Sequence, residues 1–412
     1  MGKTKTKSRN NSKDILRSAN APLVKSAVAS KSQKSTEDLL AEAATLLEHS
    51  QPEQALPLIQ EALKRLETDK QAYSDIDILL HNAAQEKATF PTALVLGADV
   101  CSALGDIDKA RAQYELAVQI DPNGALVSAE PYLELAQLSE EGGRKSIDYF
   151  EKAVEVMKNE IEVLDEQLDI EGTQQIVDMR RAKVAEALCG MAEVYMTDLS
   201  WEEDAEQRCE QLVTEAIAIC PESLSAGVLQ TLASIRISQD RLDEAKRTLA
   251  QSLAIWKGIP ADVEDPARPD FATRVSLVRL LMEVEHEQDA MVVLEGLVKE
   301  DDQSVEAWYL GGWCHLLISQ KPDIGEDAKS ANVQQAQEWL ANCLKLYQIL
   351  QYEDEPLRSH AEELVRELNR TLNIEGDEDE WEDADDDENA SDGDNIEAID
   401  DDHARDEDVE MT

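Results

Sequence analysis

The feature that most constrains the fold of this chain is a helical pattern that repeats about every 34 residues. Its clearest copy runs from residue 91 to residue 124, with a Gly-Asp turn between two apolar-periodic stretches. The residues that recur at helical spacing are small or apolar: Leu94, Ala98, Cys101, Ala110, Tyr114 and Ala117. Small residues let two helices approach closely, and Pro122 stops the second helix. The pattern therefore predicts helical hairpins that stack along the chain.

Other stretches show the same pattern with decreasing fidelity: residues 36–69, 129–157, 185–221, 226–259, 271–304 and 305–348. Insertions at about 70–90, 158–180 and 321–335 break the period. This pattern resembles the tetratricopeptide repeat. The resemblance covers most of residues 36–348 and implies an all-α solenoid of about seven irregular hairpins. The amphipathic stretch from Pro356 to Leu372 is expected to be a capping helix.

Composition favours the same fold class, because strong helix formers dominate and only 16 Gly and 12 Pro interrupt 412 residues. The net charge of -49 is unevenly distributed. Residues 1–34 carry +8 and residues 372–412 carry -20, which leaves -37 on residues 35–371. Both ends are too poor in apolar residues to bury a core, so we expect a basic disordered head and an acidic disordered tail around a solenoid over 35–371.

A strongly negative surface attracts basic proteins and repels nucleic acid and anionic membranes. We therefore expect a basic protein client, no direct nucleic-acid binding and no membrane binding. No apolar run reaches the ~18 residues of a membrane span. The basic start of the chain is not a secretory signal, so we expect a cytoplasmic and nuclear protein.

The sequence shows no pattern typical of catalysis, of a cofactor site or of a metal site. Its six histidines are scattered, and it contains no HExxH, GxGxxG or Walker-type motif. Its six cysteines form no CxxC pair, so we interpret them as reduced, small apolar residues. The prediction is a protein that is not an enzyme, with no cofactor and no metal.

The tetratricopeptide resemblance implies binding along a concave surface lined by the first helix of each hairpin. Aligning the repeats on their small residues places mainly acidic side chains there: Glu37, Asp99, Glu130, Gln137, Glu140, Glu141, Glu186, Glu193, Glu283 and Glu306. Arg279 is an exception. Tyr309 and Trp313, four residues apart, either stack on a client's Arg or Pro or pack internally. All of these residues except Glu37 and Arg279 make up our predicted client-binding site, although some of the acids are also typical of an ordinary solvated helix face.

The combination of basic head, acidic repeats and acidic tail resembles the fungal dedicated assembly chaperones of large-subunit ribosomal protein four. That resemblance implies capture of the client's long basic internal loop, protection from aggregation and escort to the nucleus. An acidic tetratricopeptide histone chaperone and a generic interaction scaffold remain alternatives. The purest acidic run is C-terminal rather than within the repeats, which favours the ribosomal client. The acidic tail either serves only to keep the protein soluble or competes with RNA for the client.

Overall fold

The computed structural model describes residues 34–67, 76–83, 85, 87–139, 142–166, 168, 170, 172–260 and 263–374. Within these ranges the regular structure is helical and contains no strand, which confirms the predicted all-α class. The predicted basic head and acidic tail lie outside the described residues, apart from Lys34 and residues 372–374. Contacts divide the chain into two compact units, residues 1–300 and 301–412, which are described separately.

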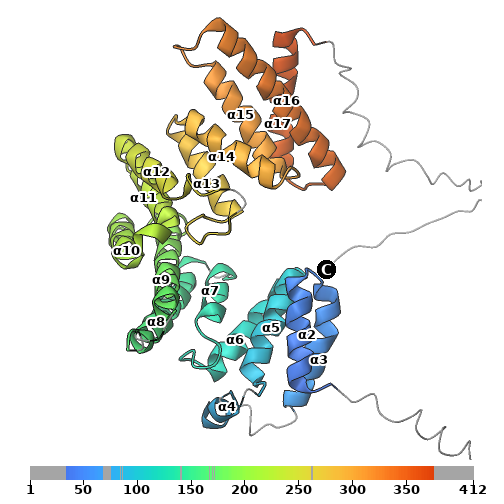
Figure 1. The fold of residues 1–412 in the computed structure, drawn as a ribbon, viewed down its shortest axis with the longest axis vertical. Coiled ribbons are helices and arrows are strands. Elements are labelled where there is room, and N and C mark those ends of the chain that lie inside the picture. The colour runs from blue at the N-terminus through green and yellow to red at the C-terminus, as the bar shows by residue number, and fades with distance from the viewer. Residues whose placement is uncertain are drawn as a thin grey trace, which may run out of the picture. The chain divides into compact units, whose positions relative to one another are not determined.

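The first unit consists of consecutive helical hairpins, drawn from blue to yellow in Figure 1. The hairpins are α2 (Thr36–Glu48) with α3 (Pro52–Glu67), α5 (Phe90–Ala103) with α6 (Ile107–Ile120), α7 (Glu130–Gln137) with α8 (Gly143–Asp165), α9 (Thr173–Met196) with α10 (Ala205–Ile219), α11 (Ala226–Ser238) with α12 (Leu242–Trp256), and α13 (Phe271–Glu283) with α14 (Glu287–Glu300). The short α4 (Ile76–Ala83) lies between the first two hairpins.

The second unit contains one more hairpin, α15 (Val305–Ser319) with α16 (Glu326–Leu350), followed by α17 (Glu355–Leu372). Gly311 allows a close approach of the two hairpin helices, because an added Cβ atom would overlap the ring of Trp339. The buried face of α17 packs against α16 through Leu357, Ala361, Leu364, Val365 and Leu368. The predicted capping helix is thus confirmed as the last helix of the described chain.

The α5–α6 hairpin shows how the repeat pattern determines local structure. Ala98, Ala110 and Ala117 are fully buried where the helices pack, and the Tyr114 ring fills the adjoining core. The second helix ends at Ile120, directly before Asp121-Pro122. Buried Asp121 then accepts hydrogen bonds from the backbone N–H groups of residues 125, 126 and 127, at 3.0, 2.6 and 3.0 Å. These bonds fix the turn that leads into the next hairpin.

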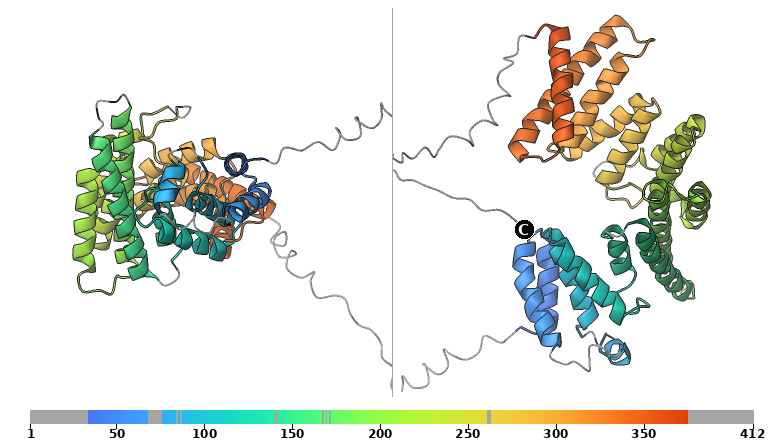
Figure 2. Two further views of the ribbon diagram at one scale, coloured as in Figure 1. Left: turned by 90° about the horizontal axis from the view of Figure 1, so that it is seen from below. Right: turned by 180° about the vertical axis from the view of Figure 1, so that it is seen from behind.

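The insertions that interrupt the repeat period are mainly lengthened helices. Residues 158–165 and 326–335 contain neither Gly nor Pro, so α8 continues to Asp165 and α16 already begins at Glu326. Figure 2 shows the long helices of the α8–α9 region in green from two further directions. The insertion at 70–90 instead accommodates the separate helix α4.

Candidate binding groove

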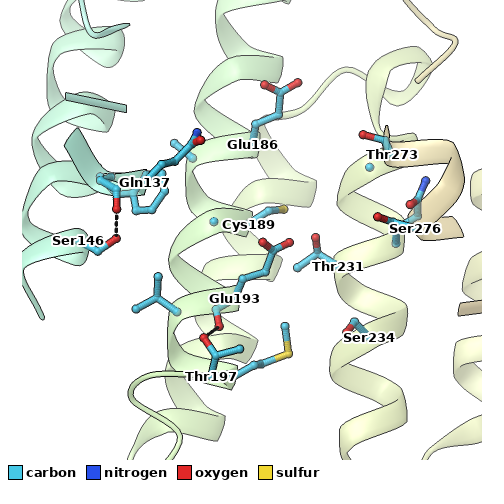
Figure 3. A pocket seen from close by; sticks show the side chains of 18 of the residues that line it. Gln137, Ser146, Glu186, Cys189, Glu193, Thr197, Thr231, Ser234, Thr273 and Ser276 are labelled. Carbon is cyan, nitrogen blue, oxygen red and sulfur yellow. Dashed lines mark hydrogen bonds between the residues drawn. The ribbon is translucent and has the colours of Figure 1, made fainter. Parts of the chain in front are cut away.

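A groove of about 1320 Å³ lies within the first unit, where the first helices of four successive hairpins face the same space (Figure 3). These helices are α7, α9, α11 and α13, and α8 contributes Ser146 and Phe150. On α9 the lining positions 183, 186, 190 and 193 recur every three or four residues, and positions 187, 189, 194 and 196 beside them also line the groove. That spacing places them on one face of the helix, so the groove follows directly from stacking similar hairpins.

Negative charge predominates on the groove walls. Five carboxylates and two cations line it: Glu130, Glu134, Glu186, Glu193 and Asp198, with Lys183 and Arg279. Lys183 approaches Glu130 with 3.8 Å between the ammonium nitrogen and a carboxylate oxygen. Figure 3 shows Glu186 and Glu193 projecting from α9 into the groove. The walls therefore carry more negative charge than their own cations neutralise.

Three of these carboxylates are partly desolvated by the groove, although the side chains of Glu186 and Glu193 remain exposed to solvent. Desolvation raises the pKa of Glu193, and it is the main cause of the raised pKa of Glu186, where Lys183 acts in the opposite direction. Desolvation also raises the pKa of Glu134, with a further contribution from the negative charges of Asp99 and Glu130. An ionised carboxylate that has lost part of its hydration gains more from a nearby cation than a fully hydrated one.

The α11 and α13 side, here called the floor of the groove, carries hydroxyl groups beside apolar residues and Arg279. Thr231 and Ser234 on α11 and Thr273 and Ser276 on α13 present hydroxyl groups there. Gln230 is 5% exposed, and its Nε2 atom has no hydrogen-bond partner among the described residues. Such donors and acceptors are suited to the amide groups of a polypeptide main chain.

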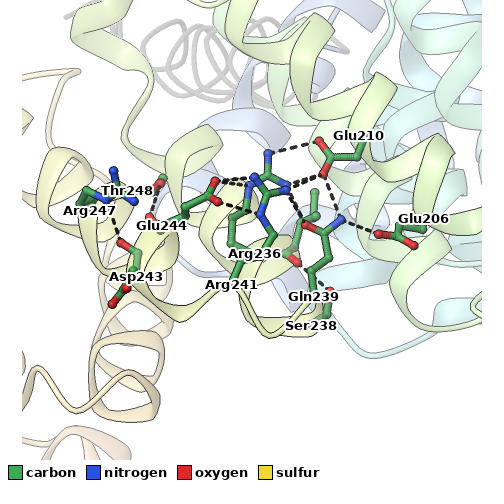
Figure 4. A network of polar contacts seen from close by, with 11 residues as sticks. Glu206, Glu210, Arg236, Ser238, Gln239, Arg241, Asp243, Glu244, Arg247 and Thr248 are labelled. Atoms are coloured by element: carbon green, nitrogen blue, oxygen red, sulfur yellow. Dashed lines mark hydrogen bonds and ion pairs between the residues drawn. The ribbon is translucent and has the colours of Figure 1, made fainter.

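Outside the groove, by contrast, Arg236 and Arg241 are paired with glutamates of the same chain. Figure 4 shows Arg236 and Arg241 gathered around Glu210 and Glu244, where α10 meets the turn between α11 and α12. The Arg236 guanidinium lowers the pKa of Glu210. Glu210 is thus an acid compensated within the chain, whereas the groove acids are only partly compensated.

The structure brings part of the predicted site together in this groove. Glu130, Gln137, Glu186 and Glu193 line it, and so does Arg279, the predicted exception. Glu140 and Glu141 lie outside the described residues.

Three other predicted positions in the first unit do not line the groove. Asp99 accepts a hydrogen bond of 2.5 Å from the Tyr114 hydroxyl and is half-buried on α5. Glu37 on α2 accepts a hydrogen bond of 3.2 Å from the backbone N–H of Ala88. Glu283 is exposed at the last residue of α13.

The remaining predicted residues, Glu306, Tyr309 and Trp313, belong to the second unit. Tyr309 is hydrogen-bonded to His360, with 2.6 Å between the hydroxyl oxygen and Nδ1. The Trp313 ring lies edge-on to the same imidazole, with 5.6 Å between ring centroids. Both aromatic side chains pack against the buried cluster of this unit. Internal packing, one of the two roles that the sequence left open, is what the structure shows for them.

Comparison with known proteins supports the tetratricopeptide-type fold and identifies related proteins. The tetratricopeptide-repeat profile matches residues 92–123, within the α5–α6 region. A probable assembly chaperone of rpl4 from Emericella nidulans is 40% identical over 357 residues, which cover 83% of each chain. The corresponding protein of Schizosaccharomyces pombe is 34% identical over 303 residues, covering 71% of this chain and 86% of its own. The chain belongs to the family of the assembly chaperones of rpl4.

A solved structure in this family agrees with the fold described above. The assembly chaperone of RpL4 (Acl4) is 40% identical and superposes with a TM-score of 0.58. The alignment covers 70% of this chain and 98% of that one. The tetratricopeptide-type architecture predicted from the repeat pattern is thereby confirmed.

Several groove residues were missed by the sequence prediction. Glu134 follows Glu130 by one helical turn, and Lys183 precedes Glu186 by three residues, so both were accessible to the same spacing argument. The hydroxyl-bearing floor was missed for another reason. A search for charge does not detect Thr231, Ser234 or Ser276.

The described residues show no sign of a metal centre or of a membrane span. No three His, Cys, Asp or Glu side chains within them gather in a way that would hold a metal ion. No helix in the described ranges combines the length and the apolar composition needed to cross a bilayer. All six cysteines are free and buried, as expected of small apolar residues. Burial raises the pKa of the groove-lining Cys189 thiol to about 12, so this thiol is protonated at neutral pH.

Proposed function

We propose that this chain is an assembly chaperone of the ribosomal protein rpl4 and holds a basic segment of that protein in the α7–α13 groove. The family names support rpl4 as the client. The observation that carries the groove assignment is the pair Glu186 and Glu193, two poorly compensated carboxylates that project from one face of α9 into a polypeptide-sized space. The chain acts by binding rather than by catalysis.

The chemistry of the groove fits a basic, extended polypeptide. A segment that is rich in Lys and Arg repels itself and does not fold without a source of negative charge. The carboxylates of α7 and α9 provide that charge, while the hydroxyl groups of α11 and α13 are placed to bond with the main chain. Binding in this way shields the cations of the segment and keeps the client soluble until RNA replaces the chaperone.

We further propose that this protein acts in both the cytoplasm and the nucleus. A ribosomal protein is synthesised in the cytoplasm and joins its subunit in the nucleus, so the chaperone works in both compartments. Its excess of 88 Asp and Glu over 39 Lys and Arg opposes direct binding to nucleic acid or to anionic membranes.

The test is capture of purified rpl4 by the full-length chain, with core histones as a competing basic client. The double charge reversal Glu186→Lys and Glu193→Lys should strongly weaken capture. The matched control is Glu162→Lys with Glu295→Lys, which changes the net charge equally at two exposed acids outside the groove. Circular dichroism should show both variants folded.

Three outcomes would count against the proposal. Unchanged capture by the groove variant would move the site elsewhere on the chain. Equal weakening by both double variants would show that net charge alone drives binding. A preference for histones over rpl4 would instead support the histone-chaperone alternative.

A further inference from the structure

Trp201 is the most exposed large apolar side chain among the described residues, with 77% of its surface accessible. It lies in the turn between α9 and α10. The described tryptophans at positions 256, 308, 313 and 339 are buried or half-buried. An indole ring left open to water is a common anchor for a partner, because it combines a large contact area with few rotatable bonds.

The Trp201 ring is tethered to its own turn by a hydrogen bond. Its Nε1–H group donates a hydrogen bond of 2.9 Å to the backbone carbonyl of Asp198. Leu199 anchors this turn to the rest of the hairpin. Its side chain is 4% exposed, and its backbone N–H donates a hydrogen bond of 3.0 Å to the carbonyl of Val194. A partner would therefore meet a pre-oriented aromatic face and lose little conformational entropy by binding it.

This turn adjoins the groove and adds to its negative charge. Asp198, to which Trp201 is bonded, is itself a groove-lining residue. Two nearby acids are already paired, since Glu202 binds Arg144 at 2.5 Å and Asp204 binds Arg208 at 3.0 Å. Asp198 and Glu203 are exposed, and neither forms an ion pair within the described part of the chain. The turn thus combines an aromatic face with two carboxylates that have no cation of their own.

We propose that Trp201 and Asp198 form a rim subsite for an arginine side chain of the client, at the end of the groove next to the α9–α10 turn. A guanidinium group stacks on the indole face and faces the carboxylates of Asp198 and Glu203. Trp is the aromatic residue that attracts cations most strongly, and the planar guanidinium stacks better than an ammonium group. This inference rests on the proposed function, because it takes the occupant of the groove to be basic.

The first experiment measures the affinity of the full-length chain for purified rpl4 after Trp201→Leu, which keeps an apolar side chain but removes the aromatic face. We expect a loss of about three- to tenfold, with Trp201→Phe intermediate, and no decrease in melting temperature because the ring is exposed. The control is Ile176→Ala, which shortens another exposed apolar side chain of the same α9–α10 hairpin.

The second experiment tests arginine directly. Arg→Lys substitutions are made singly along the basic segment of rpl4 and combined with Trp201→Leu in double-mutant cycles. One Arg→Lys change should weaken binding to the wild-type chain but not to the leucine variant. In parallel, the fluorescence difference between the wild-type chain and Trp201→Phe isolates the Trp201 indole, and rpl4 should protect it from acrylamide quenching.

Unchanged affinity for Trp201→Leu, while Glu186→Lys with Glu193→Lys abolishes capture, would overturn the rim subsite and leave the proposed function standing. If the groove reversal also has no effect, the proposed function itself fails. A fall in the solution mass of Trp201→Leu from dimer to monomer would assign the ring to contacts between copies of this chain and would likewise overturn the subsite.

Discussion

Replacement of Glu134, Glu186 and Glu193 by Gln should make the chain weaker in binding but no less stable. The substitutions keep the size of the side chains and remove their negative charge, while one carboxylate oxygen of each becomes an amide NH2 donor. All three carboxylates have raised pKa values in the folded chain, chiefly because of desolvation. The variant therefore separates what these charges do for the fold from what they do for the client.

The sign of the stability effect follows from proton linkage. The unfolded carboxyls titrate near their ordinary pKa of 4.5, below their folded values. At pH values between 4.5 and the folded pKa values, the folded chain binds more protons than the unfolded chain. The stability of the folded chain therefore falls as pH rises through this range. At pH 7 the Gln variant should melt at the same temperature as the wild type or higher, and the difference should shrink as the pH falls toward 4.5.

Binding should change in the opposite direction. Two opposite charges 4 Å apart attract by about 4 kcal/mol at an effective dielectric constant of about 20, and screening reduces the net gain to ~1 kcal/mol for each partly exposed pair. Three such pairs amount to ~3 kcal/mol, or roughly 100-fold in affinity. Calorimetric titration with rpl4 at fixed salt measures this loss, with Gln at Glu151, Glu162 and Glu295 as the control. Unchanged affinity, or melting several degrees lower than wild type, would refute the reasoning.

Increasing salt from about 50 to about 500 mM should weaken rpl4 binding without abolishing it, because exposed charges are screened more than buried contacts; the same affinity at both would make charge incidental. Gly311→Ala should destabilise the second unit by about 1–3 kcal/mol in thermal unfolding, since the new methyl group overlaps the Trp339 ring. Tyr309→Phe should cost ~1 kcal/mol there through the lost hydrogen bond to His360. Deletion of residues 375–412 should preserve helical content and rpl4 binding but let added RNA displace rpl4 more easily; equal resistance would make the tail only a solubilising segment.

The repeat pattern predicted the hairpins well because each depends on local spacing. Ala98, Ala110 and Ala117 are fully buried in the structure, as close helix packing requires. The lengths of the helices were harder to predict, because a break in the period does not reveal whether the chain leaves the helix or extends it. Residues 158–165 extend α8, whereas the insertion at 70–90 holds a separate helix.

The lining of the groove was predicted less completely than the hairpins, since repeat alignment identifies a helix face but not its surroundings. Glu186 and Glu193 both line the groove because they share a face of α9. Asp99 has the equivalent register, but the Tyr114 hydroxyl binds its carboxylate. Glu283 lies beyond the last groove-lining residue of α13, Leu280. Whether an aligned acid lines the groove depends on side chains from other helices. The alignment of single repeat positions gives no information about those side chains.

We propose that the unequal pairing of acids within the first unit connects capture of the client with its release. Glu210 is paired with Arg236, and the pairing lowers its pKa, whereas Glu186 and Glu193 keep raised pKa values although Lys183 and Arg279 also line the groove. The chain can therefore compensate its acids, yet it leaves those of the groove in need of external cations. A basic client supplies these cations. The positive charges that bind it to the groove are the ones that later bind RNA. Because RNA has a much higher density of negative charge than the groove, it can replace the chaperone without any change in the fold of the chaperone.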